Sequence, residues 1–479
     1  MSVTEAPNRA AASPQLSRTE IEANGAVPIL YLFGGALVWL LLASVLELLA
    51  SVKLHMPGLL AGSALLTYGR VQAASQSLFI YGFGVPAALG SGLWLLCRLG
   101  KTRLAGPGVV TLGTLFWNFA VTAGLWAILR GANTGYAALE FPRAVASVLL
   151  IAYLVISVCG IVTFHHRAAA PLYPSQWFVV GALFWFAWIY STVMGLLLCT
   201  PARGVLQASV DWWYQHNLST VYFGFAGLAS IFYFIPKLTR RPLHSRLQAA
   251  FAFWMLALVG SWGGIPDGSP LPSWIIGMSV VGTVFTLVPI LAVVINLRET
   301  TAHSMPSLDA NPCLRFTCVG LLFWVIASVQ EVVAALPSVG ALTNFTWFTV
   351  AQRDLFRYGF LAMTMFGAFY YIAPRLAAPK SASPDSLWCP RLYKAHFWLT
   401  ILGVFIGYIS LLAAGLWQGV MLNNSANSFM AVLKSSMTAI RMSTTGPLLF
   451  AVGTLVFLLN FAQLLKNNCC PCCQRKGDA

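Results

Sequence analysis

Charged residues are scarce in this chain. Of 479 residues, 9% are charged and only 13 are Asp or Glu, whereas about a quarter of a typical soluble sequence is charged. This scarcity excludes a soluble enzyme and a disordered protein. The ten cysteines do not provide the regular framework of a secreted disulfide scaffold, because six are scattered singly and four lie within 469–473. The hydrophobic content of 58% and the mean hydropathy of +0.76 indicate an integral membrane protein.

Long apolar runs, each separated from the next by Pro, Gly or charged residues, recur along the whole chain. A helix needs about 20 mostly apolar residues to cross the hydrocarbon of a bilayer. Windows of that kind predict twelve spans, at 27–50, 75–97, 108–129, 144–164, 176–199, 213–236, 248–265, 274–296, 313–336, 347–373, 396–417 and 446–465. The loops between them are short, so we expect an all-α integral membrane protein with one twelve-helix bundle.

Positive charge reports the topology of such a bundle, because cytoplasmic loops carry an excess of Lys and Arg. Most of the 28 basic residues fall on the side that holds both ends of the chain. The sequence therefore predicts a multi-pass protein of the inner (cytoplasmic) membrane, with a cytoplasmic tail at 1–26, a transmembrane domain at 27–465 and a Cys-rich cytoplasmic tail at 466–479. The net charge of +15 follows from this topology and does not require a nucleic-acid partner.

Three stretches of sequence carry a family resemblance. The sixth predicted span opens with Asp211-Trp-Trp-Tyr-Gln-His-Asn217 and closes with Tyr233-Phe-Ile-Pro-Lys237. The tenth ends Phe366-Gly-Ala-Phe-Tyr-Tyr-Ile-Ala-Pro-Arg-Leu376, and Lys53-Leu-His-Met-Pro57 with Tyr68-Gly-Arg70 precedes the second. From about residue 40 to 380, the chain resembles the catalytic subunit I of cbb3-type heme-copper oxidases, a twelve-helix protein with cytoplasmic termini.

The resemblance implies heme and copper, held in that family by six histidines on the second, sixth, seventh and tenth helices, since imidazole suits both metals. Ser75 occupies the position of the second-helix histidine, and Gln352 and Asp354 occupy those of the tenth. The pair on the seventh falls at Gly264 and Ile265, and the nearby family tyrosine falls near Gly268. His216 on the sixth is the only ligand position retained, so we expect no bound heme and no catalytic residue.

Other polar residues within the predicted spans remain candidates for a site. His216 is a residual metal ligand or a hydrogen-bonded core histidine. Arg353, Asp354 and Arg357, together with Gln352, form either a wet pocket in the emptied heme site or an internal ion pair, since Asp354 and Arg357 share a helix face. Glu47 and Glu331 are further acids that could lie on a proton path.

Cysteine and histidine near the ends of spans offer two more candidates. Cys469, Cys470, Cys472 and Cys473 have spacings that could bind a soft metal such as zinc or cuprous copper, although S-acylation or a reduced cluster equally suits their place after the last span. His165 and His166 lie at the end of the fourth span rather than in the seventh, so we interpret them as a pair at the membrane interface.

These patterns favour a heme-free relative of oxidase subunit I, without catalytic activity, that serves as a membrane scaffold or accessory subunit of a respiratory or electron-transfer complex. Its expected partners are the membrane and other respiratory or cytochrome subunits. Two alternatives stay open. One is a proton or small-solute path through the emptied heme cavity, and the other is an active heme-copper oxidoreductase, with cytochrome c oxidase as the family activity, that uses unconventional ligands.

Overall fold

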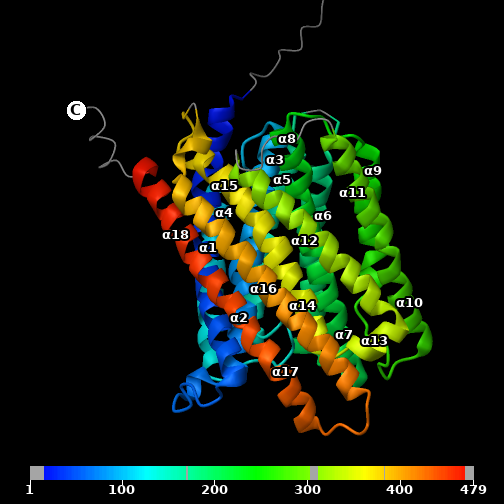
Figure 1. The fold of residues 1–479 in the computed structure, drawn as a ribbon. Helices are drawn as coiled ribbons and strands as arrows, with labels where there is room; N and C mark the ends of the chain where they lie inside the picture. Colours follow the sequence, from blue (N-terminus) through cyan, green and yellow to red (C-terminus); the bar gives the residue numbers. More distant parts are fainter. Residues whose placement is uncertain (1–15, 169–170, 303–310, 382, 470–479) are drawn as a thin grey trace, which may run out of the picture.

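The described part of the chain is built entirely of helices and their connections. A computed structural model describes residues 16–168, 171–302, 311–381 and 383–469. Within those residues, eleven helical segments are long and apolar enough to cross a membrane, and no strand is present. The helices stand side by side as one bundle (Figure 1). The predicted all-α membrane fold is therefore confirmed.

The helices follow the predicted spans closely. In chain order they are α1 (Arg18–His55), α2 (Tyr68–Ser77), α3 (Val85–Gly100), α4 (Pro107–Leu129), α5 (Arg143–His165), α6 (Pro174–Val193), α7 (Val205–His216), α8 (Gly224–Thr239), α9 (Arg246–Leu258), α10 (Ser273–Phe285), α11 (Leu287–Thr301), α12 (Pro312–Ala335), α13 (Pro337–Thr343), α14 (Trp347–Asp354), α15 (Met363–Ala377), α16 (Pro390–Leu422), α17 (Phe429–Ser443) and α18 (Thr445–Cys469). Short 3-10 helices lie at Ala64–Leu66, Gly260–Trp262 and Pro384–Leu387.

The helix at the seventh predicted span is shorter than the sequence predicts. Its helix, α9, contains 13 residues and ends at Leu258, where the prediction runs to 265. Gly260, Gly263, Gly264 and Pro266 follow, and glycine and proline are the residues that helices tolerate least. The chain still passes from one face of the bundle to the other between α9 and the start of α10 (Figure 1). The segment crosses as a short helix continued by an irregular loop.

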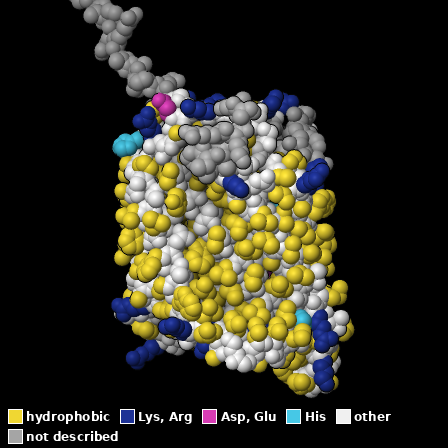
Figure 2. Space-filling model, turned by 90° about the vertical axis from the view of Figure 1, so that its left-hand side faces the viewer, with side chains coloured by type: hydrophobic (Ala, Val, Ile, Leu, Met, Phe, Trp, Pro, Cys, Tyr) yellow, Lys and Arg dark blue, Asp and Glu magenta, His cyan; other side chains and the backbone are white. Residues whose placement is uncertain are grey.

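Three spans form the centre of the bundle. In the segments Tyr68–Gly100, Val205–Thr239 and Trp347–Ala377, between 94% and 100% of the most apolar window is buried, against 33% to 50% for every other span found in the described residues. The outer helices present their apolar side chains as a broad hydrophobic belt, with Lys and Arg near its upper and lower borders (Figure 2). The central spans are also the ones that carry the family motifs.

Each central span changes from α-helix to π-helix within the membrane. The π segments are η2 (Leu78–Gly84), η4 (Asn217–Phe223) and η7 (Leu355–Ala362). They begin shortly after Ser75, His216 and Asp354 respectively. A π segment adds a residue to the turn and rotates the following side chains, and such segments occur frequently at functional sites. Three of the six positions at which the resemblance implies metal ligands therefore lie at changes in helix geometry.

Both ends of the described chain lie on the same face. The start of α1 and the end of α18 are together at the top of Figure 1, as an even number of crossings requires. Helix α1 begins at Arg18, before the predicted boundary at 27, because Ser17 and Glu20 form a capping box that satisfies its first amides. That this face is cytoplasmic remains a prediction from the distribution of Lys and Arg.

Candidate functional site

Ser75, at the position of the family's second-helix heme ligand, is engaged with its neighbours. Its side chain is fully buried, and its Oγ atom lies 2.8 Å from Oε2 of Glu47 and 3.0 Å from the carbonyl oxygen of Ala43. Both partners belong to α1. A serine hydroxyl is not among the side chains that hold heme iron in proteins. This position therefore joins α2 to α1 by hydrogen bonds.

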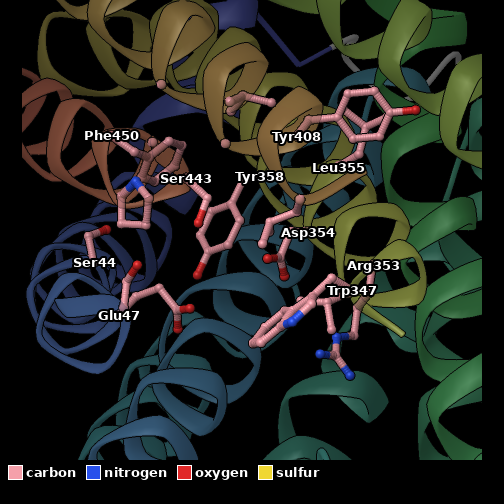
Figure 3. Close-up of a pocket in the computed structure, with 18 of the residues that line it drawn as sticks. Ser44, Glu47, Trp347, Arg353, Asp354, Leu355, Tyr358, Tyr408, Ser443 and Phe450 are labelled. Atoms are coloured by element: carbon pink, nitrogen blue, oxygen red, sulfur yellow. The ribbon is translucent and has the colours of Figure 1, made fainter. Parts of the chain in front are cut away.

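A pocket lies beside Ser75. It encloses about 850 Å³ including the space at its mouth, and it is formed by α1, α2, α14, η7, α16, α17 and α18. Figure 3 shows the carboxylates of Glu47 and Asp354 directed into it from opposite sides, with the ring of Tyr358 between them. We call it the Glu47–Asp354 pocket. Its polar and aromatic lining residues are Ser44, Glu47, Ser51, Tyr68, Gln72, Trp347, Arg353, Asp354, Tyr358, Tyr408, Ser443 and Phe450.

The lining of this pocket does not suit a low-spin heme. Such a heme needs two strong axial ligands, commonly histidine or histidine with methionine. Among the described residues that line the pocket there is no His, Met or Cys. The carboxylate of Asp354, where the family would place an imidazole, is a hard oxygen ligand. The residues present therefore do not fit the group that the resemblance implies.

His216 is buried, with 3% of its side chain exposed, and both of its ring nitrogens have partners. Nε2 lies 2.7 Å from the carbonyl oxygen of Gly260, and Nδ1 lies 2.9 Å from Oε1 of Glu331 on α12. A carbonyl oxygen only accepts, so Nε2 carries a proton and donates it. Nδ1 and Glu331 then share a second proton between them. In this arrangement neither nitrogen offers a free lone pair to a metal.

The backbone after α9 presses against the His216 ring. A Cβ atom added to Gly263 would lie 2.7 Å from Nε2 of His216, and one added to Gly264 would overlap Cβ of His216 and lie 2.8 Å from its Cγ. Gly264 also has φ of +98°, a conformation that favours glycine. No larger residue fits there unless His216 moves. Gly264, where the resemblance implies a copper ligand, therefore packs directly against His216.

A second pocket lies on the other side of α14, and we call it the Glu331–Gln352 pocket. It encloses about 680 Å³ including its mouth, and its polar lining includes Asp267, Thr283, Glu331 and Gln352. Gln352 and Asp354 are two residues apart on a helix, so their side chains point about 200° apart. The sequence grouped them in one region, and the structure divides them between two pockets.

The expected ion pair between Asp354 and Arg357 is absent from the described residues, since no nitrogen of Arg353 or Arg357 lies within 4.0 Å of an Asp354 oxygen. Figure 3 shows the guanidinium of Arg353 turned away from Asp354. Arg357 is buried, and it is not among the residues that line either pocket. That interpretation of the charges was wrong. Asp354 and Gln352 instead line two separate pockets.

A buried histidine on α16 was not predicted from the sequence. His396 is fully buried, its ring stacks on Phe457 with centroids 4.6 Å apart, and its Nδ1 lies 3.0 Å from the hydroxyl of Tyr370. Its Nε2 has no hydrogen-bond partner among the described residues. The only signal was a lone histidine within an apolar run. It lies in aromatic packing, away from both pockets.

The remaining candidates are placed as follows. His165 and His166 lie at the end of α5 with ring centroids 5.7 Å apart, as expected for a pair at the membrane border. Cys470, Cys472 and Cys473 lie outside the described residues, as does the side chain of Cys469. Within the described residues, no group of three or more His, Cys, Asp or Glu side chains could hold a metal ion.

Removing the partner of His216 has a predictable effect on stability. We expect Glu331→Ala to lower the free energy of unfolding by about 2 kcal/mol, because the buried Nδ1 of His216 loses its hydrogen bond. Glu331→Gln retains a side chain that can bond to Nδ1, so it should cost less than about 1 kcal/mol. Thermal unfolding of the detergent-solubilised variants measures both. Equal losses in the two variants would contradict the hydrogen-bonded pair.

Known proteins resemble this chain over most of its length. The sequence pattern of the family described as cytochrome c and quinol oxidase polypeptide I matches residues 27–454. The cbb3-type cytochrome c oxidase subunit CcoN1 of Stutzerimonas stutzeri is 25% identical over 441 residues, which cover 88% of this chain and 91% of the relative. Cytochrome c oxidase subunit 1 of Rhodobacter capsulatus is 24% identical over 421 residues, which cover 83% of this chain and 77% of that protein.

The fold matches a solved structure as well. A heme-copper terminal oxidase, determined as a dimer by cryo-electron microscopy, superposes with a TM-score of 0.72 at 11% sequence identity, covering 93% of this chain and 84% of that one. This likeness concerns the fold. The family match spans most of the chain and agrees with the motifs on the three central spans. The chain belongs to the cytochrome c and quinol oxidase polypeptide I family.

Proposed function

We propose that this chain is a heme-free, non-catalytic relative of cbb3-type oxidase subunit I that serves as a membrane scaffold or accessory subunit of a respiratory or electron-transfer complex. The observation that carries the proposal is the state of the ligand positions. Ser75 is bonded to α1, His216 has both nitrogens engaged, and Gly264 packs against the His216 ring. A chain retained for oxygen reduction needs imidazoles at these positions.

Direct packing of the central spans supports the same proposal. A Cβ atom at Gly84 would lie 2.8 Å from the Phe223 ring, and one at Gly227 would overlap the Phe360 ring. These contacts join η2 and η4, and α8 and η7. Small residues that allow close approach are typical of stable helix interfaces in membranes. The three central spans therefore hold together through their own side chains, as a subunit without resident heme requires.

The scaffold role is tested by isolating the chain with its natural partners. We expect a tagged chain, extracted from native membranes in mild detergent, to co-purify in fixed stoichiometry with subunits that themselves bear heme. A tagged unrelated membrane protein from the same membranes is the control. A chain that purifies alone after cross-linking in intact cells would overturn the scaffold role.

A second candidate function is a proton or small-solute path through the emptied heme site. The observation that favours it is the Glu47–Asp354 pocket, which keeps charged side chains in a membrane-spanning region without a direct ion pair. Charges at membrane depth face water, a partner or a substrate, because hydrocarbon does not solvate them. A heme-free subunit can hold such a pocket, so the two candidates are compatible.

A further inference from the structure

The Glu47–Asp354 pocket offers a ligand two carboxylates from opposite walls. Glu47 comes from α1, Asp354 from the end of α14, and both point into the same space (Figure 3). Glu47 has Ser75 as a hydrogen-bond partner at 2.8 Å. Asp354 has no side-chain hydrogen bond or ion pair within the described residues. Asp354 is therefore available to a ligand.

Five aromatic rings also line the pocket. Trp347, Tyr358 and Tyr408 line the pocket from the side of α14, η7 and α16, and Tyr68 and Phe450 complete it. The face of an aromatic ring attracts a cation held within about 6 Å, and cages of such rings recognise quaternary ammonium groups. Carboxylates and aromatic faces together favour positive charge on an organic body.

Of the two nearby arginines, only Arg353 lines the pocket. The Arg353 guanidinium is turned away from the two carboxylates (Figure 3), and Arg357 is not a lining residue. Glu47 and Asp354, which point into the space from opposite walls, offer an anionic ligand no positive charge. A bare calcium ion requires six or more oxygen ligands. The aromatic residues that line the pocket do not provide them.

We propose that the Glu47–Asp354 pocket binds a lipophilic organic cation, an amine or quaternary ammonium compound with an apolar body. The charged centre of the ligand lies between the two carboxylates, and the apolar groups of the ligand contact Trp347 and Tyr358. This inference rests on the second candidate function, in which no heme fills the pocket, and it names the class of solute.

Tetraphenylphosphonium and tetraphenylborate provide a matched pair of probes, since they share size and shape and differ in the sign of their charge. Equilibrium dialysis of each probe against the full chain in zwitterionic lipid nanodiscs, with empty nanodiscs subtracted, measures saturable binding. We expect one site for the cation and none for the anion. Asp354→Asn and Glu47→Gln should each weaken cation binding at least about tenfold, as should Trp347→Ala. Asp267→Asn, in the other pocket, is the control and should leave it unchanged.

The inference is overturned by equal saturable binding of both probes, by cation binding that Asp354→Asn, Glu47→Gln and Trp347→Ala all leave intact, or by the absence of saturable cation binding. Size-exclusion chromatography of every variant shows whether it is folded, and Trp347→Ala provides a test that does not change charge. A pyridine hemochrome assay on the same preparation separates the two claims. Bound heme would contradict the proposed function, whereas a heme-free chain without saturable cation binding would contradict only this inference.

Discussion

Gly264→Ala is expected to destabilise the protein by about 3 kcal/mol. The added Cβ would overlap Cβ of His216 and lie 3.2 Å from the carbonyl oxygen of Trp212, and φ of +98° strains any residue with a side chain. Overpacking of a tight interior costs about 1–3 kcal/mol, and a left-handed backbone adds about 1 kcal/mol. Gly264 packs directly against His216, at which the resemblance implies a copper ligand. An added side chain therefore has no space there.

Gly268→Ala provides the matched control for that substitution. Gly268 lies in the same loop and has φ of +80°, but a Cβ atom there would have no neighbour within 4 Å. It should therefore show only the backbone cost of about 1 kcal/mol. Differential scanning fluorimetry of both purified variants in one detergent gives the comparison. Similar unfolding temperatures for the two variants would contradict the close packing of Gly264 on His216.

The second large effect is expected at the contact between α16 and α14. A Cβ atom at Gly415 would overlap the backbone nitrogen of Phe348 and lie 2.5 Å from its Cα, so the two helices must separate before alanine fits. A side chain can relieve a clash by changing its rotamer, but the backbone of a helix cannot. Gly415→Ala should cost about 3 kcal/mol or more and reduce the yield of folded protein severely.

Gly277→Ala tests whether that loss is specific to the contact. Gly277 lies within α10, where a Cβ atom would meet nothing within 4 Å. Alanine is favoured over glycine in a helix by about 1 kcal/mol, so this variant should be as stable as the parent or more stable. Membrane yield and monodispersity on size-exclusion chromatography are the readouts. A folded, monodisperse Gly415→Ala protein would contradict the observed helix contact.

The sequence predicted the bundle well because long apolar runs leave few alternatives in a bilayer. Each predicted span corresponds to a helical segment of the structure, and the motifs around His216 and Tyr370 lie on the central spans. The exception was the end of the seventh span. There, apolarity continued past Leu258, while Gly260 and the glycines after it ended the helix.

The site was harder to predict because its contacts join residues distant along the chain. Composition and spacing identified Ser75, Glu47, His216 and Glu331 singly. They gave no reason to pair Ser75 with Glu47, or His216 with Glu331. The expected Asp354–Arg357 ion pair assumed a regular helix. The π segment η7 begins between these residues, so the spacing of a regular α-helix does not hold across them.

The heme content of the purified chain distinguishes a heme-free subunit from an oxidoreductase. The full chain, expressed alone with heme in excess, is compared with the CcoN1 relative prepared in parallel, using reduced-minus-oxidised absorption spectra and the pyridine hemochrome assay. We expect no stoichiometric heme in this chain, because the positions of Ser75 and Asp354 offer no imidazole and both ring nitrogens of His216 have hydrogen-bond partners. One or two hemes per chain would contradict this expectation and restore an oxidoreductase with unconventional ligands.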